Sequence, residues 1–222
     1  KLKSSKKGNP EKGDKIIVLG GDNYRLGMGG SAVSSVATGE FANAIELNAV
    51  QRANPEMQKR VANAIRAMAE AEENPIVSIH DHGAGGHLNC LSELVENSGG
   101  NIDIKALPVG DPTLSDKEIA GNESQERMGL VMKESDTDLL KKVADRERAP
   151  MYIVGEVTGD GNFRFVNEDN DKNPIDWKLD HMFGNSPKTV LEDTSTTLKF
   201  SPLSYDQSKI QYYLEAVLQI ES

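Results

Sequence analysis

The sequence is poor in cysteine, in aromatic residues and in long apolar runs. A single cysteine among 222 residues, Cys90, excludes a disulfide framework and fits a reducing compartment, so we expect a cytoplasmic protein. The longest apolar runs are only a few residues, which excludes a membrane-spanning helix, and the first residues lack the apolar stretch of a secretory signal. We therefore expect no membrane association.

Basic residues are also in the minority. Lys and Arg number 25 against 35 Asp and Glu, which gives a net charge of −10 and a sequence pI of about 5.0. No basic block follows the opening KLKSSKK, so we expect no nucleic-acid partner, and any bound anion must be held by backbone N–H groups and a few arginines. The first residue is Lys, not Met, which leads us to expect a piece of a longer polypeptide.

Short apolar segments alternate with helical patterns along the chain. We expect strands at 15–20, 74–81, 101–109 and 127–133, and a hairpin over 151–167 that turns at 159–161. We expect helices at 54–72, 88–100, 115–123 and 136–148, three of them capped by Asn54, Ser115 and Asp136. This alternation predicts an α/β or α+β fold in which a mixed sheet packs against helices.

The domain organisation follows from where this pattern starts and stops. Residues 1–14 are polar and broken by Gly and Pro, which predicts a flexible tail or linker. Residues 15–192 form the expected domain, and 193–222 are expected to be a connector and a helix with one apolar face. That face either folds back on the domain or contacts a following domain.

A glycine-rich segment, LGMGGSA, follows the first expected strand. It places Gly27, Gly29 and Gly30 before a small-residue helix expected at 31–41, an arrangement that can aim backbone N–H groups at a phosphate. No Gly-Lys-Ser/Thr follows, so it is not a Walker loop, and the preceding strand ends too early for a dinucleotide fold. A phosphate site and a plain turn both stay open.

The segment IHDHGAGGHLN holds three of the four histidines of the chain, His80, His82 and His87, which raises the question of zinc. In a strand, His80 and His82 share one face and Asp81 points to the other. The glycines end the strand at Asp81, a common position for a carboxylate that binds a hard divalent cation, for which histidine is a poor ligand. We therefore favour Asp81 as a metal ligand, and solvent exposure or ordinary packing for the histidines.

Two further polar stretches could bind a ligand. NESQERM offers Glu123, Ser124 and Gln125 as donors and acceptors, although composition alone favours a solvated loop. Gln51 and Arg52 precede the helix expected at 54–72, where an amide and a guanidinium could contact a polar group. A simple lead-in to that helix is the interpretation that the sequence favours there.

In this order, the glycine segment, VQRANPEM, IHDHGAGG, NESQERM, RERAP and PIDWKLDHMFGNSPK closely resemble phosphoribosylformylglycinamidine synthase, a purine-pathway ligase. The resemblance covers residues 15–192. It implies the C-terminal half of the first aminoimidazole ribonucleotide synthetase-like unit of the large, single-chain form. The ATP-binding half, the second such unit and the glutaminase domain with its Cys-His-Glu triad are outside this sequence, and Cys90 is not that nucleophile.

The resemblance also implies the chemistry. Formylglycinamide ribonucleotide, glutamine and ATP would give the amidine, glutamate, ADP and phosphate in an ATP-dependent, glutamine-hydrolysing carbon–nitrogen ligation. ATP would be bound mainly by the missing half, with Mg²⁺ as the metal, and the partners would be this substrate and the rest of the same polypeptide. This piece alone is expected to be inactive, and no catalytic residue is assigned within it.

Residue roles carry over by position. Asp81 corresponds to the Mg²⁺-ligating aspartate, and the glycines Gly27, Gly29 and Gly30 would face the ribonucleotide phosphate. The expected substrate contacts are Gln51, Glu123, Ser124 and Gln125. The family commonly has apolar residues in place of His82 and His87, which argues further against zinc.

Two questions stay open at this point. The expected C-terminal half could serve the active site or an auxiliary nucleotide site. Alternatively, the chain could be a stand-alone ligand-binding or regulatory domain of the same superfamily fold.

Overall fold

The computed structural model describes residues 7–30, 33, 36–37, 39–40, 42–49, 54–169, 173–184, 190, 194, 197 and 199–220. They fall into two compact units, Lys1–Asn185 and Ser186–Ser222. In the second unit, the short turn η4 (Gln207–Lys209) leads into helix α8 (Ile210–Leu218), whose apolar side chains are exposed. None of the helices in the described part of the chain is long and apolar enough to cross a membrane.

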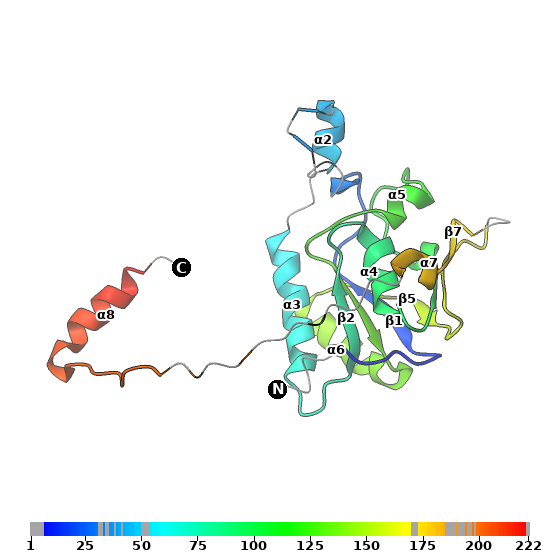
Figure 1. The fold of residues 1–222 in the computed structure, drawn as a ribbon. Coiled ribbons are helices and arrows are strands. Elements are labelled where there is room, and N and C mark those ends of the chain that lie inside the picture. Colours follow the sequence, from blue (N-terminus) through cyan, green and yellow to red (C-terminus); the bar gives the residue numbers. More distant parts are fainter. Residues whose placement is uncertain are drawn as a thin grey trace. The chain divides into compact units, whose positions relative to one another are not determined.

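The first unit is built on a mixed seven-stranded sheet (Figure 1), ordered β2-β4-β1-β5-β3-β6-β7. The strands are β1 (Lys15–Leu19), β2 (Ile76–Asp81), β3 (Gly100–Asp103), β4 (Met128–Met132), β5 (Met151–Val157), β6 (Asn162–Val166) and β7 (Ile175–Lys178). All neighbours are antiparallel except β3 and β6. Leu19 and Asp81 both pair with Met128, so the C-terminal ends of β1 and β2 lie at the same edge of the sheet.

The helices of this unit are α2 (Asn43–Ala49), α3 (Pro55–Ala69), α4 (Gly86–Leu94), α5 (Asp116–Ala120), α6 (Thr137–Glu147) and α7 (Leu179–Phe183). All of them except α2 contribute buried side chains to the cores on the two faces of the sheet. Because side chains alternate along a strand, Ile16 packs into one core with α4, while Ile17 packs into a second core with α3 and α6. Figure 1 accordingly shows α3 and α7 on opposite sides of the strands. This arrangement confirms the expected mixed sheet packed against helices.

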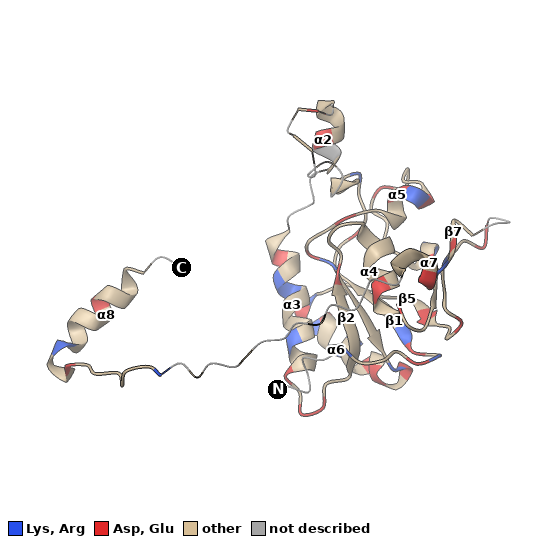
Figure 2. Ribbon diagram, viewed as in Figure 1, with Lys and Arg blue, Asp and Glu red and all other residues tan. Residues whose placement is uncertain are grey.

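The elements with strong local signals are where the sequence predicts them. Asn54 accepts a hydrogen bond from the Met57 N–H at 3.0 Å at the start of α3. Ser115 and Glu118 form a reciprocal capping box at α5. Figure 2 shows Lys and Arg interspersed with Asp and Glu along the described helices and strands.

The predicted hairpin over 151–167 is wrong. β5 and β6 do not pair with each other, because β3 lies between them, antiparallel to β5 and parallel to β6. The turn at Gly159–Gly161 reverses the chain direction but leaves room for a third strand. β3, which comes from a distant part of the sequence and runs parallel to β6, therefore occupies the position beside β6 that the hairpin prediction gave to β5.

Two element boundaries and one helix cap also differ from the prediction. β3 stops at Asp103, whose carboxylate accepts from the Lys105 N–H at 2.9 Å and starts the 3-10 turn η2 (Ile104–Ala106). α4 begins two residues earlier than expected, at Gly86. Asp136 precedes α6 but makes no capping hydrogen bond, because it belongs to the 3-10 turn η3 (Glu134–Asp136) and already has helical dihedral angles.

The sequence pattern did not predict β7 and α7. The helix expected at 31–41 lies mostly outside the described residues. Residues 7–14, expected to be a flexible tail, contact the sheet through the Gly8 N–H, which donates to the Val77 carbonyl at 2.7 Å, and the Gly13 N–H, which donates to the Val157 carbonyl at 2.9 Å.

Candidate functional site

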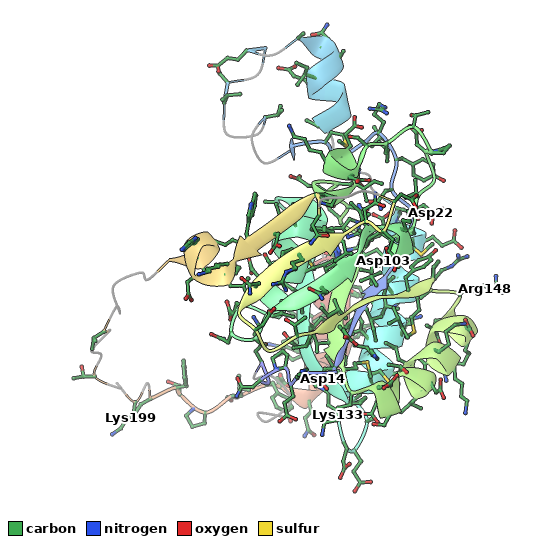
Figure 3. All side chains as sticks on the ribbon, turned by 90° about the vertical axis from the view of Figure 1, so that its right-hand side faces the viewer. Asp14, Asp22, Asp103, Lys133, Arg148 and Lys199 are labelled. Carbon is green, nitrogen blue, oxygen red and sulfur yellow. The ribbon has the colours of Figure 1, made fainter. Side chains whose placement is uncertain are left out.

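Three loops that are distant in sequence meet at the edge of the sheet where β1 and β2 end. They are the glycine-rich loop after β1 (20–30), the turn after β2 (82–85) and the loop before β4 (121–127). Figure 3 marks the two ends of β1, with Asp22 just beyond the C-terminal end and Asp14 just before the start. Three of the four polar stretches singled out from the sequence are therefore brought together.

Glu123 joins the two glycine loops. Its N–H donates to the Gly27 carbonyl at 2.9 Å, and its carboxylate accepts from the Gly85 N–H at 3.0 Å. Gly85 is the N-cap of α4, and the Glu123 carboxylate accepts from its N–H at the end of the helix where the dipole favours negative charge. The side chain is only 1% exposed.

Gly27 and Gly86 lie so close to the backbone of the loop before β4 that neither position has room for a side chain. A Cβ at Gly27 would lie 2.1 Å from the Glu123 carbonyl oxygen, and a Cβ at Gly86 would lie 2.4 Å from the Asn122 carbonyl oxygen. Both residues also have positive φ, at 73° and 59°. A Cβ at Gly29 would meet nothing within 4 Å, so of the three glycines predicted to face a phosphate it is the one with open space beside it.

A buried arginine links all three loops. Arg127 is 0% exposed, and its Nη1 donates to Asn23 Oδ1 and, at 2.7 Å, to His87 Nε2. Its Nη2 donates to the carbonyl of Asn122 at 3.1 Å and to Asn122 Oδ1 at 2.5 Å. The orientation of the Asn23 amide is fixed because its Nδ2 donates to the Pro108 carbonyl at 2.7 Å. One guanidinium thus holds the glycine-rich loop, the start of α4 and the loop before β4.

The contacts of two buried histidines indicate their tautomers. His87 Nε2 lies 2.7 Å from Arg127 Nη1, which can only donate, and 3.0 Å from Asn23 Oδ1, which can only accept. We assign the Nε2 lone pair to the shorter, charge-assisted contact with Arg127, which places the ring proton of His87 on Nδ1. This N–H donates to His82 Nε2 at 2.9 Å, which places the proton of His82 on Nδ1, an atom without a hydrogen-bond partner among the described residues. Burial lowers the pKa of both rings well below the ordinary value and the Arg127 charge lowers it further, so both are neutral at pH 7.

These findings correct two expectations. The NESQER segment is not a solvated loop, because all of its residues except Gln125 are buried. His82 and His87 are neither solvent-exposed nor in ordinary apolar packing but belong to a buried polar network. His80 is partly exposed and paired with Glu93 of α4, and the described residues contain no group of three or more side chains of the metal-ligating types His, Cys, Asp and Glu.

Asp81 is placed as the strand pattern predicts, on the face of β2 opposite to His80 and His82. Its side chain is 68% exposed, and its Oδ2 accepts from the Gly83 N–H at 3.1 Å. One exposed carboxylate fits Mg²⁺, which keeps several waters and takes further oxygen ligands from a substrate. It does not fit zinc, which needs three or four protein ligands. The metal role of Asp81 stays a prediction.

The predicted substrate contacts differ in accessibility. Gln125 is exposed, whereas Glu123 and Ser124 are each 1% exposed, and the Ser124 hydroxyl donates to Glu126. Gln51 lies outside the described residues. Their role as substrate contacts stays a prediction, and the structure adds that Glu123 also orders the loops.

Sequence reasoning missed Asn23 and Arg127 as parts of the site. The one available signal was a charged residue directly before the apolar strand MGLVM, at a position where a strand enters the core. Cys90, in contrast, lies where a thiol is a poor nucleophile, as the prediction holds. Its side chain is buried in α4, and burial raises the pKa of its thiol far above the ordinary value.

Fold and site together define a class of protein: an α/β domain that gathers glycine-rich and polar loops at one edge of a mixed sheet. Residues 11–167 match the family described as AIR synthase related protein, C-terminal domain. The chain belongs to this family.

Curated relatives agree with the resemblance that the motifs carry. The chain is 42% identical over 200 residues to the phosphoribosylformylglycinamidine synthase of Dictyostelium discoideum, covering 87% of this chain and 15% of that protein. It is 36% identical over 211 residues to the probable chloroplastic/mitochondrial phosphoribosylformylglycinamidine synthase of Arabidopsis thaliana, covering 90% of this chain and 14% of that protein. The chain thus spans only a small part of either relative.

Solved structures share the fold. T. maritima PurL complexed with FGAR superposes with a TM-score of 0.72 at 24% identity, covering 89% of this chain and 32% of that chain. T. maritima PurL complexed with ATP gives a TM-score of 0.65 at 21% identity, over 95% of this chain and 32% of that chain. These likenesses confirm the expected fold class.

Proposed function

We propose that this chain is the C-terminal half of an AIR synthase-like unit in a phosphoribosylformylglycinamidine synthase. The full-length ligase would convert formylglycinamide ribonucleotide, glutamine and ATP to the amidine, glutamate, ADP and phosphate. The supporting observation is that the three motif loops meet at one sheet edge in a chain 42% identical to a curated enzyme of that name. Because the chain spans 15% of that relative, ATP binding and glutamine hydrolysis belong mainly to other parts of the polypeptide.

In this proposal Asp81 holds the metal. When bound, Mg²⁺ neutralises charge on the transferred phosphoryl group, the main requirement of phosphoryl transfer. The exposure of Asp81 leaves its carboxylate open to a cation that shares its other positions between water and phosphate oxygens. The main chain near Gly27, Gly29 and Gly30 faces the ribonucleotide phosphate, with Gly29 as the open position.

Substrate contacts come from the loop before β4 and from the lead-in to α3. Gln125 is accessible to a ligand, and Gln51 is assigned to the same role by its motif. Glu123 and Ser124 belong to the same proposed set of substrate contacts, and their hydrogen bonds also hold the loop that presents Gln125. A relative complexed with FGAR supports this class of substrate. The single cysteine, buried and unpaired, supports a cytoplasmic location.

Calorimetry tests the proposal. The full-length polypeptide should bind formylglycinamide ribonucleotide in the presence of Mg²⁺, and Gln125→Ala and Gln51→Ala should each weaken binding about tenfold, the effect of one lost polar contact. Gln58→Ala, an exposed glutamine on α3, is the matched control and should bind as the unaltered protein does. Absence of binding by the unaltered protein, or unchanged affinity in both site variants, would refute the assignment.

A further inference from the structure

We propose that Arg127, His87 and His82 form a buried positioning network that holds the Asp81 turn and the glycine-rich loop in register for the reaction. None of the three touches the substrate in this account, so they are positioning residues and not catalytic ones. The inference rests on the proposed function, because it assigns these side chains a role in organising that same site.

The contacts of Arg127 are concentrated at the site edge. Its guanidinium bonds to Asn23, Asn122 and His87, each of which lies in or beside one of the three site loops. A buried arginine is costly to desolvate, and apolar residues of similar volume often stabilise a core as well or better. Stability alone therefore does not account for a fully buried arginine at this position, whereas the need to fix three polar loops does.

The network reaches Asp81 through His82. The His82 N–H donates to the Arg127 carbonyl at 3.3 Å, and the His82 carbonyl accepts from the Ser124 N–H at 3.1 Å, so the backbone of His82 is held on both sides. Its ring is held by His87 at 2.9 Å. Asp81 is the preceding residue and pairs with Met128, the residue after Arg127. A shift of His82 consequently moves the Asp81 carboxylate.

His87 is the link that can be tested without removing a charge. Asparagine can supply a donor near the Nδ1 position, so His87→Asn keeps the bond to His82 and loses the bond from Arg127. Glutamine can supply an acceptor near the Nε2 position, so His87→Gln keeps the bond from Arg127 and loses the bond to His82. A continuous network requires both bonds, and both variants should then be impaired.

The experiment uses the full-length polypeptide with formylglycinamide ribonucleotide, glutamine and ATP-Mg²⁺. We expect His87→Asn and His87→Gln to lower kcat about tenfold each and Arg127→Met about a hundredfold, since small misplacements of reacting groups have effects of this size. The KM for the ribonucleotide should change less than about threefold, because the side chains that contact it are retained. Arg164→Met, which removes a guanidinium on β6 that pairs with Asp160 and Asp176, is the matched control and should retain kcat.

Hydrogen exchange supplies a readout that is independent of turnover. The Gly85 N–H, bonded to Glu123 at 3.0 Å, should lose protection in the His87 variants, while amides of β1 and β4 keep theirs. If Arg127→Met fails to fold, the two His87 variants still decide the question.

Two results would overturn the inference. One is unchanged kcat and unchanged Gly85 protection in both His87 variants. The other is impairment in only one of them, because that would leave a local contact and not a network. Asp81→Asn separates this inference from the proposed function: if Asp81→Asn abolishes synthesis while the His87 variants do not impair it, only the network is wrong. If Asp81→Asn is fully active, the proposed metal role fails as well.

Discussion

Two neutral histidines lie beside a buried arginine at the centre of the site, and their neutrality has an energetic consequence. His82 and His87 have pKa values lowered by burial and by Arg127, whereas in the unfolded chain they titrate near the ordinary value of 6.5. Below that pH the unfolded chain binds protons that the folded chain does not. Stability from these residues is therefore present above about pH 6.5 and is lost as the pH falls below it.

The first prediction at the residue scale concerns this pH dependence. Between pH 7.5 and 5.5 each of the two histidines should reduce the free energy of unfolding by about 1.4 kcal/mol. Urea unfolding at both pH values measures this decrease in the free energy of unfolding. In His87→Asn the decrease should be smaller than in the unaltered chain by about 1.4 kcal/mol. An equal drop in His87→Asn and the unaltered chain would mean that His87 is not held neutral.

The buried network itself could not be predicted from the sequence. Asn23 and Arg127 are too far from His82 and His87 in the chain for spacing to indicate contact, and all four residue types are common at surfaces. Asp81 is different, because the alternation of a strand and the glycines that end it are local signals that placed its side chain correctly. Local rules place side chains on faces, but only tertiary packing decides which faces meet.

At the scale of elements, the junction between β2 and α4 depends on Gly86. Gly86→Ala should lower the free energy of unfolding by about 3 kcal/mol or more, because the left-handed conformation is strained for alanine and the new Cβ collides with the Asn122 backbone. Gly161→Ala is the matched control: its φ is +72° but nothing lies within 4 Å, so it should cost only about 1–2 kcal/mol. Thermal or urea unfolding of both variants measures the difference. Equal losses would show that the contact between Gly86 and Asn122 is not tight.

The elements show where sequence-based prediction succeeds and fails. The starts of α3 and α5 were predicted because Asn54, Ser115 and Glu118 cap them through bonds within three residues. The hairpin failed because β3, some fifty residues upstream of β5, pairs with both of its strands. Pairing between distant segments is set by the packing of the whole sheet, which turn residues such as Gly159 and Gly161 do not encode.

At the scale of the whole molecule, our proposal is that this chain supplies one side of a site. The three loops are ordered by Glu123 and Arg127 from within, while Asp81 and Gln125 are exposed. Rigid support of these loops is expected, because groups that position reactants must themselves be held in a fixed geometry. The relatives are much longer than the chain, so in our proposal the ATP-binding half covers this edge and completes the site.

The most direct test of this account is the rate of amidine synthesis by the full-length polypeptide carrying Asp81→Asn, measured with glutamine as the nitrogen source. We predict that kcat falls by about a hundredfold or more, because metal-assisted charge neutralisation is lost, while glutamine hydrolysis persists. Asp138→Asn, an exposed aspartate on α6, should retain the full rate. Synthesis by Asp81→Asn at the rate of the unaltered enzyme would contradict the central claim that this sheet edge carries the metal of the ligase reaction.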